Sequence, residues 1–272
     1  MYMILILLIL LTFTNAYYNE TIAKMAVDLS QSAYCISDVN IWNCTTCNSG
    51  AKLEFVVENK GVRALQGYQK EINSIFTAFR GSSNINNWIN NIEIRKISPY
   101  NDSKIAVARG FYNEYQYVKQ ALLENIYSLS KKYNTNKLLI TGHSSGAACA
   151  TIMVYDINVN NKDLDMAYFF NFGSPRVGNK NFANSFNNIT AYRITHYYDM
   201  VPHIPEEFLG FQHIQREIWY NKDNTNYEIC KDTEQEDNSC SNSCAPLHCT
   251  STSDHLNYLN VSMGSADKEV CI

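Results

Sequence analysis

Apolar residues recur along the chain in two patterns that predict two kinds of secondary structure. Spacings of three and four residues, which place side chains on one face of a helix, occur in 21–34 and 110–133. Short apolar runs typical of buried strands occur at 53–57, 75–79, 138–141, 167–172 and 191–197. Further helical stretches lie between 141 and 167 and between 172 and 191. Because strands alternate with helices, the chain is predicted to be of the α/β class, with a mostly parallel central sheet and helices on both faces.

The first sixteen residues, MYMILILLILLTFTNA, differ from the rest of the chain. Their apolar stretch, from Met3 to Leu11, is shorter than the roughly 20 residues that a membrane-spanning helix needs, and small residues follow it. We interpret 1–16 as a secretory signal peptide, with a buried first helix or a retained anchor as the alternative. No linker rich in proline, glycine or serine divides 17–272, so a single domain is expected there. The expected location is extracellular or the lumen of a secretory vesicle.

Cysteine usage agrees with export. Cys149 lies alone inside an apolar segment and is expected to be a free, buried thiol. The other eight cysteines are expected to form disulfides, and the sequence leaves about 105 pairings open: Cys35, Cys44, Cys47, Cys230, Cys240, Cys244, Cys249 and Cys271. A zinc site that combines several of these residues and His248 is the weaker alternative, because the spacings are irregular and an oxidising compartment favours disulfides. Glycosylation sequons also fit export and stand at Asn19, Asn43, Asn101, Asn188 and Asn260.

The charge of the chain excludes one class of partner. The formal net charge is −4 and the pI is near 5.9, so there is no basic field of the kind that nucleic acid requires. No motif implies a metal or an organic cofactor, and no protein partner is implied.

The segment TGHSSGAA, 141–148, follows an apolar strand-like run and precedes a stretch of small residues. This is the context of a nucleophile elbow, in which a serine occupies a strained turn between a strand and a helix. The flanking residues must be small there, and the hydroxyl points out at the carboxyl edge of the sheet. A bare GxSxG match is common, but this context favours Ser144 as a nucleophile over an ordinary loop serine.

A serine nucleophile needs a general base and an orienting acid, which follow in the order Ser, Asp or Glu, His on an α/β-hydrolase sheet. Asp199 closes the strand-like segment ITHYYD, and a turn aspartate before proline is its alternative role. Among the later histidines, His203 is too near Asp199, His213 and His248 have no distinguishing context, and His255 lies in a late loop. The oxyanion hole needs donors, for which the backbone N–H of Ser145 and the N–H and hydroxyl of Ser82 are candidates.

Six segments resemble, in order, the blocks of the class 3 (fungal lipase-like) lipases: FRGSSNINNWI at 79–89, GFYNEY at 110–115, TGHSSGAA, FGSPRVGN at 172–179, DMVPHIP at 199–205 and DHLNYL at 254–259. The resemblance implies the α/β-hydrolase fold, with Ser144 as nucleophile, Asp199 as orienting acid and His255 as general base. It also assigns the oxyanion hole to Ser82 and Ser145. The family usually reads GHSLGGA, so Ser145 is a departure. Because its contribution is a backbone N–H, its side chain is expected to matter little to the chemistry.

The resemblance further implies a secreted triacylglycerol lipase that works through an acyl-enzyme. Its substrate would be a lipid or ester at an oil–water or membrane interface. A phospholipase A1 or a feruloyl-type carboxylesterase on the same fold is the alternative, since a fold does not determine a substrate. A non-catalytic lipid-binding relative is disfavoured because all three catalytic roles are filled.

The class 3 lipases carry a mobile lid at the position of SNINNWINNI, 83–92. Apolar residues of this segment fall on one face of a helix and asparagines on the other. This pattern fits a lid, but it also fits an ordinary surface helix whose apolar face packs on the core. The apolar residues are Ile85, Trp88, Ile89 and Ile92. The resemblance also implies the disulfides Cys35–Cys271 and Cys44–Cys47. For the remaining cysteines we expect Cys230–Cys240 and Cys244–Cys249.

Overall fold

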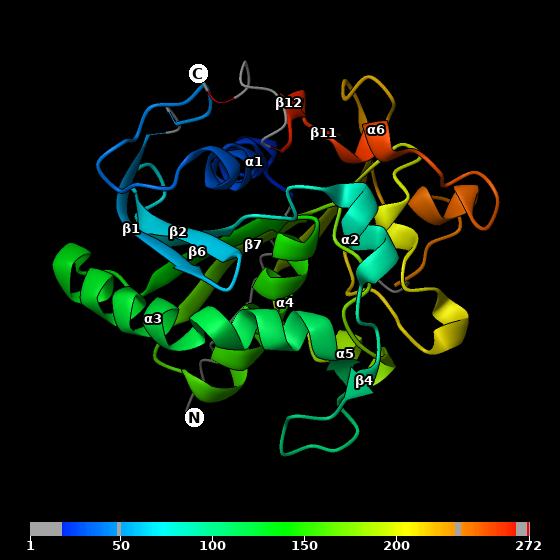
Figure 1. Cartoon of the computed structure of the whole chain (residues 1–272), viewed down its shortest axis with the longest axis horizontal. Coiled ribbons are helices and arrows are strands. Elements are labelled where there is room, and N and C mark those ends of the chain that lie inside the picture. The colour runs from blue at the N-terminus through cyan, green and yellow to red at the C-terminus, as the bar shows by residue number, and fades with distance from the viewer. Residues whose placement is uncertain (1–17, 48–49, 232–234, 265–270, 272) are drawn as a thin grey trace, which may run out of the picture.

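The structure is a computed structural model, and it describes residues 18–47, 50–231, 235–264 and 271 (Figure 1). The predicted signal peptide lies outside the described residues. Within the described part of the chain, no helix combines the length and the apolar character that a membrane crossing requires.

An eight-stranded sheet forms the centre of the molecule, in the order β1-β2-β3-β6-β7-β8-β9-β10. Its middle is parallel, from β3 through β6, β7 and β8 to β9, and antiparallel pairs complete both edges. The predicted mostly parallel α/β architecture is therefore confirmed. The strands are β1 (Ala51–Asn59), β2 (Val62–Gln69), β3 (Ser74–Phe79), β6 (Lys137–His143), β7 (Asp165–Phe172), β8 (Ala191–His196), β9 (Glu217–Tyr220) and β10 (Tyr227–Ile229).

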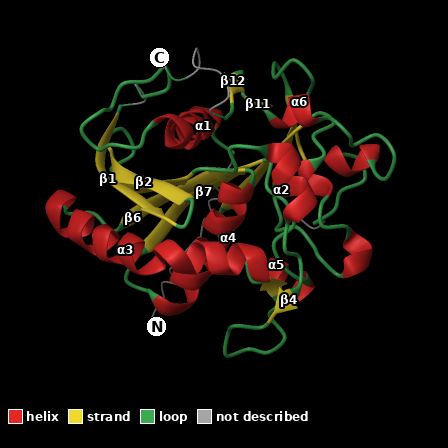
Figure 2. Ribbon diagram, in the orientation of Figure 1, coloured by secondary structure: helices red, strands yellow, loops and turns green. Residues whose placement is uncertain are grey.

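Helices cover both faces of this sheet (Figures 1 and 2). One face carries α1 (Glu20–Cys35), and the other carries α3 (Arg109–Tyr133), α4 (Ser145–Asn160) and α5 (Lys180–Asn184). The remaining elements are short and lie toward the carboxyl edge of the sheet or beside the helices: α2 (Ile85–Asn91), β4 (Lys96–Ile97), β5 (Val107–Ala108), α6 (Thr252–His255), β11 (Asn257–Tyr258), β12 (Val261–Ser262) and the 3₁₀ turns Val201–His203, Glu207–Leu209 and Ser241–Cys244.

Strand β6 shows how the sheet divides the interior into two apolar cores. Successive side chains of a strand point to opposite faces. Leu138 and Ile140 accordingly pack in the core beneath α3 and α4, while Leu139 packs in the core beneath α1. Helix α3 buries the predicted stripe, whose members are Phe111, Tyr115, Val118, Leu122, Ile126 and Leu129.

Strand β2 is absent from the sequence-based prediction because its sequence, VRALQGYQ, does not alternate apolar and polar residues. Gln66 is fully buried in this strand. Its Nε2 donates to Thr77 Oγ1 at 3.1 Å and to the carbonyl of Leu122 at 3.0 Å. A buried amide is tolerated only when such partners exist, and these come from β3 and α3.

The structure contains the four disulfides that were expected, Cys35–Cys271, Cys44–Cys47, Cys230–Cys240 and Cys244–Cys249. Their sulfurs are therefore not available as thiolate ligands for zinc. Cys149 is free and buried, with its Sγ 3.5 Å from Glu114 Oε2.

Removing the Cys35–Cys271 disulfide is expected to lower the free energy of unfolding by about 5 kcal/mol in the chain-entropy model. The bond closes a loop with a sequence separation of 236 and ties α1 to the carboxyl end of the chain. The measurement is urea unfolding of the Cys35→Ser/Cys271→Ser double variant. Its control is the Cys44→Ser/Cys47→Ser variant, whose loop has a separation of 3. Because the chain-entropy model ties stabilisation to loop length, equal losses in both variants would contradict it.

Candidate active site

Ser144 stands at the junction of β6 and α4 with φ 58° and ψ −130°, a strained backbone conformation for a residue with a side chain. Its neighbours explain the two glycines of the motif. A Cβ on Gly142 would lie 2.6 Å from the carbonyl oxygen of Gly146, and one on Gly146 would lie 2.6 Å from that of Arg80. Any larger residue would therefore push the strand, the helix and the loop after β3 apart. The local geometry is that of a nucleophile elbow.

Asp199 and His255 meet although they are 56 residues apart in the chain. The Nδ1–H of His255 donates to Asp199 Oδ2 at 2.8 Å, and both side chains are buried. Asp199 accepts two further hydrogen bonds, from the Val201 N–H to Oδ1 at 2.8 Å and from the Tyr258 hydroxyl to Oδ2 at 2.5 Å. The Asp199 carboxylate therefore has three hydrogen-bond donors, which fix its position. Tyr258 was not among the residues expected at this site, although it lies in the same DHLNYL segment as His255.

The two atoms expected to react, Ser144 Oγ and His255 Nε2, are buried and make no hydrogen bond with any described residue. Because Nδ1 of His255 carries the proton that it donates to Asp199, Nε2 is the basic nitrogen. Hydrogen bonds between nucleophile and base are commonly unformed in substrate-free enzymes and tighten when substrate binds.

His143 lies beneath the elbow, as expected, and supports the base. Its ring is 4.5 Å from that of His255, and its Nε2–H donates to the backbone carbonyl of His255 at 2.9 Å. Burial, followed by the neighbouring His255, holds the pKa of His143 well below its usual value, so the ring is neutral. Its Nδ1 therefore accepts from the Tyr34 hydroxyl at 2.7 Å. Tyr34 itself accepts from the N–H of Gly81 in the loop after β3, so one network joins α1, the elbow and the base.

The segment that carries His255 is not the loop expected from the sequence, because a short helix, α6, ends at this residue. The Ser251 hydroxyl caps α6 by accepting from the Asp254 N–H at 3.0 Å. Two backbone hydrogen bonds join the segment to the Asp199 loop, from the Ser251 N–H to the Tyr198 carbonyl and from the Met200 N–H to the Ser251 carbonyl. The segment before α6 therefore helps to place both Asp199 and His255.

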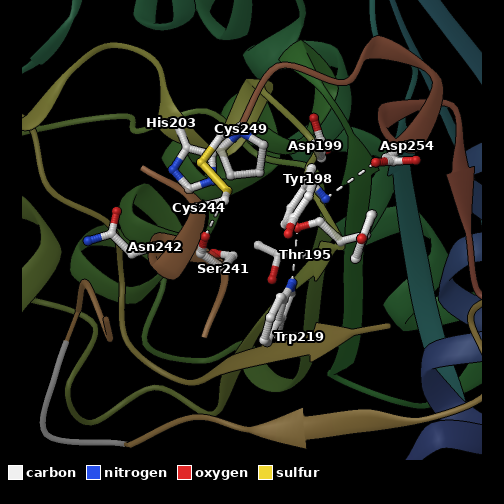
Figure 3. The surroundings of a disulfide bond; sticks show 12 residues. Thr195, Tyr198, Asp199, His203, Trp219, Ser241, Asn242, Cys244, Cys249 and Asp254 are labelled. Carbon is white, nitrogen blue, oxygen red and sulfur yellow. Dashed lines mark hydrogen bonds between the residues drawn. A yellow bond between two sulfur atoms is a disulfide. The ribbon is translucent and has the colours of Figure 1, made fainter. Parts of the chain in front are cut away.

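Figure 3 shows the Cys244–Cys249 disulfide beside His203, near the turn after β8 that carries Asp199. His203 Nε2 is 3.8 Å from Cys244 Sγ. Burial and the nearby Arg176 lower the pKa of His203 to about 4. His203 contacts the disulfide rather than the Asp199 carboxylate, whereas His213 is buried and donates to the Pro202 carbonyl at 2.6 Å. These two histidines have packing roles.

The expected oxyanion-hole residues converge on the elbow. A Cβ on Gly81 would lie 2.9 Å from the Cβ of Ser144, so the loop after β3 runs directly against the nucleophile. Ser82 follows on this loop, and Ser145 is the first residue of α4, where the N–H has no intrahelical acceptor. The two side chains also meet, with Ser82 Oγ 3.0 Å from Ser145 Oγ. From the sequence, Ser145 was expected to contribute only its backbone N–H.

Segment 83–92 forms the amphipathic helix α2 and the residues that flank it. Asn84 caps this helix by accepting from the Asn87 N–H at 3.0 Å. The four apolar residues are half-buried, whereas all five asparagines of the segment are exposed. Trp88 stacks on Phe111 of α3 with ring centroids 6.1 Å apart. A cavity of about 490 Å³ lies between the α2 segment, the loop after β3 and helices α3 and α4. Its lining includes Trp88 and Asn91 of α2, Ser82 of the loop, Phe111 and Glu114 of α3, and Ser145 and Cys149 of α4.

Comparisons with known proteins agree on one family. The family model "Lipase (class 3)" matches residues 76–209. The lipase of Rhizomucor miehei is 30% identical over 249 residues, which cover 87% of this chain and 67% of the relative. The lipase of Rhizopus niveus is 31% identical over 257 residues, which cover 87% of this chain and 62% of the relative. The chain thus spans about two thirds of the length of these relatives.

Solved structures give the same result. The Rhizomucor miehei lipase–propeptide complex superposes with a TM-score of 0.83 at 29% identity, over 92% of this chain and 84% of that one. A triacylglycerol lipase whose catalytic centre is described as a serine protease triad superposes with a TM-score of 0.81 at 29% identity, over 91% of this chain and 97% of that one. On this evidence, together with the elbow and its surroundings, the chain belongs to the class 3 lipase family.

Proposed function

We propose that this protein is a secreted serine ester hydrolase that cleaves acylglycerols through an acyl-enzyme formed on Ser144. The observation that carries the proposal is the buried 2.8 Å hydrogen bond from His255 to Asp199 beside a serine held on a strained elbow. The relatives add the substrate class. Besides the triacylglycerol lipase, a protein of Fusarium solani named as a secreted mono- and diacylglycerol lipase is 31% identical over 161 residues, 58% of this chain and 47% of the relative.

The roles follow from the geometry. His255 Nε2 removes the proton of Ser144 Oγ as this oxygen attacks the ester carbonyl, and the imidazolium that forms is stabilised by the Asp199 carboxylate. The carbonyl oxygen becomes negative and is met by the N–H of Ser145 and by the N–H and hydroxyl of Ser82. His255 then returns the proton to the departing alkoxide. A water molecule, activated by the same histidine, releases the fatty acid and restores Ser144.

Helix α2 fits the role of a lid. Trp88 and Ile92 of the segment 83–92 pack against the core that contains α3 and α4, and Ser144 and His255 are 1% and 0% exposed. Burying each apolar side chain of α2 is worth roughly 1.5–3 kcal/mol when complete, and a lipid surface could supply the same stabilisation to a displaced helix. A small difference between these two states would allow a lipid interface to reverse the balance.

The lid makes a kinetic prediction. Activity should rise sharply once a triacylglycerol exceeds its solubility, and Trp88→Ser should reduce this rise more than it affects hydrolysis of a soluble ester. The measurement is initial rate against substrate concentration across the solubility limit. Asn90→Ser, on the exposed face of the same helix, is the matched control. The lid would be contradicted if the initial rate followed simple saturation through the solubility limit and if Trp88→Ser lowered the rates on triacylglycerol and on the soluble ester equally.

Substrate comparison tests the wider proposal. The assay measures release of fatty acid from emulsified triacylglycerol, a soluble short-chain ester and a phospholipid. We expect the emulsified acylglycerol to be cleaved fastest. Preference for the phospholipid would favour a phospholipase A1, and preference for the soluble ester would favour a feruloyl-type carboxylesterase on the same fold.

A further inference from the structure

The two hydroxyl groups beside the nucleophile form a closed pair. Ser82 Oγ and Ser145 Oγ are 3.0 Å apart, and among the described residues each hydroxyl has only the other as a hydrogen-bond partner. Ser145 is 5% exposed and Ser82 is half-buried. The pair is part-buried, so its hydrogen bond is less exposed to competition from bulk water than one on the open surface.

We propose that the Ser145 side chain is a positioning residue of the oxyanion hole, which donates its hydroxyl hydrogen to Ser82 Oγ and so aims the Ser82 hydroxyl at the substrate oxygen. The proposal rests on the proposed function, because it requires a negative oxygen to form beside Ser144. It goes beyond the backbone N–H that the elbow motif assigns to this position.

The direction of the hydrogen bond follows from counting hydrogens. A serine hydroxyl has one hydrogen and two acceptor lone pairs. If Ser82 donated to Ser145, it would have no hydrogen left for the substrate oxygen. If Ser145 donates, the hydrogen of Ser82 is free and its oxygen is polarised, which strengthens it as a donor. Negative charge that develops beside Ser82 favours the second arrangement, since it attracts the Ser82 hydrogen toward the substrate.

The same bond also selects one rotamer of Ser82. The side chain of an exposed serine populates three staggered χ1 rotamers. Only some of these rotamers would direct the Ser82 hydroxyl toward Ser144. Ser145 anchors this hydroxyl from the first turn of α4, an element that is buried along most of its length. Preorganised donors stabilise a transition state without a cost of reorganisation at the moment of reaction. A leucine, which the resemblance gives as the usual residue after the nucleophile, could not donate this bond.

The neighbouring residue Cys149 offers a matched control. It lies one helical turn after Ser145 on α4 and lines the same cavity, but its thiol is directed to Glu114 at 3.5 Å. Cys149→Ala therefore removes a small side chain from the same face of α4 and leaves the hydrogen bond between Ser82 and Ser145 in place. Cys149→Ala is expected to leave kcat unchanged.

The test is a double-variant cycle of Ser145→Ala and Ser82→Ala, measured on a soluble short-chain ester so that α2 does not limit the rate. A net hydrogen bond of ordinary strength corresponds to roughly 3- to 10-fold, so Ser145→Ala should lower kcat by about this factor with KM unchanged. Ser82→Ala should lower kcat by roughly 10²-fold. The double variant should be no slower than Ser82→Ala alone. Ser145→Thr, which keeps a hydroxyl, should restore most of the activity.

A second readout separates positioning from packing. The Ser144 oxygen adds to the boron of an alkyl boronic acid and passes its proton to His255, which gives a tetrahedral anion with an oxygen in the oxyanion hole. The inhibition constant of the boronic acid should therefore rise in Ser145→Ala by the same factor as kcat falls. Equal effects of Ser145→Ala in the unaltered protein and in the Ser82→Ala variant, or a change confined to KM, would overturn the proposal. Covalent labelling by an organophosphonate tests the proposed function independently. If Ser144 is labelled but the effects of Ser145→Ala and Ser82→Ala on kcat simply add in the double variant, the protein is still a serine hydrolase and only the positioning role of Ser145 is wrong.

Discussion

Replacing Ser144 with alanine is expected to lower kcat by about 10⁶-fold, the cost of losing the nucleophile in a well-studied serine protease. The variant should remain folded, because Ser144 Oγ makes no hydrogen bond with any described residue. Its removal therefore leaves no buried partner unsatisfied. The measurement is the rate of ester hydrolysis, with a thermal unfolding scan to show that the fold persists.

Labelling with an organophosphonate supplies the control for this prediction. The reagent should modify Ser144 in the unaltered protein and should modify no serine in Ser144→Ala. Mass spectrometry of proteolytic peptides identifies the site. Substantial activity in Ser144→Ala, or labelling at another serine, would contradict the assignment of the nucleophile.

Replacing Asp199 with asparagine is expected to lower kcat by about 10⁴-fold, as the same change does in a serine protease triad. The carboxylate accepts three hydrogen bonds, from His255, Tyr258 and Val201. An amide has one oxygen and an NH₂ group that donates. His255 would then lose its acceptor at Nδ1 and favour the tautomer with its proton on Nε2, which cannot accept the proton of Ser144. The measurement is the pH profile of kcat.

Asp254 gives a matched control for this change. It lies directly before His255, but its carboxylate accepts from the backbone N–H of Tyr198 at 3.3 Å and makes no contact with the imidazole of His255 that the structure records. Asp254→Asn keeps an oxygen in this position, so kcat should be unchanged. If Asp254→Asn were as inactive as Asp199→Asn, the acid would have been assigned to the wrong carboxylate.

Features that depend on near neighbours in the chain can be predicted from the amino-acid sequence. The helical stripe of α3, the apolar strands at the centre of the sheet and the amphipathic pattern of α2 are visible because each repeats within a few residues. The elbow is visible for the same reason, since its glycines act on the backbone immediately around Ser144. The order of serine, aspartate and histidine followed from the arrangement that a serine nucleophile has on an α/β-hydrolase sheet. The resemblance to class 3 lipases, a family membership that the comparisons confirm, implied the same three residues.

Contacts between polar side chains that are distant in the chain become visible only once the chain is folded. Tyr34 and His143 are 109 residues apart in the chain, Tyr258 and Asp199 are 59 apart, and Ser82 and Ser145 are 63 apart. No local pattern records such pairs, because a tyrosine or serine has the same sequence context whether its hydroxyl meets water or a buried partner. Desolvation gives these contacts their importance, and a side chain is desolvated only when separate strands and helices are packed together.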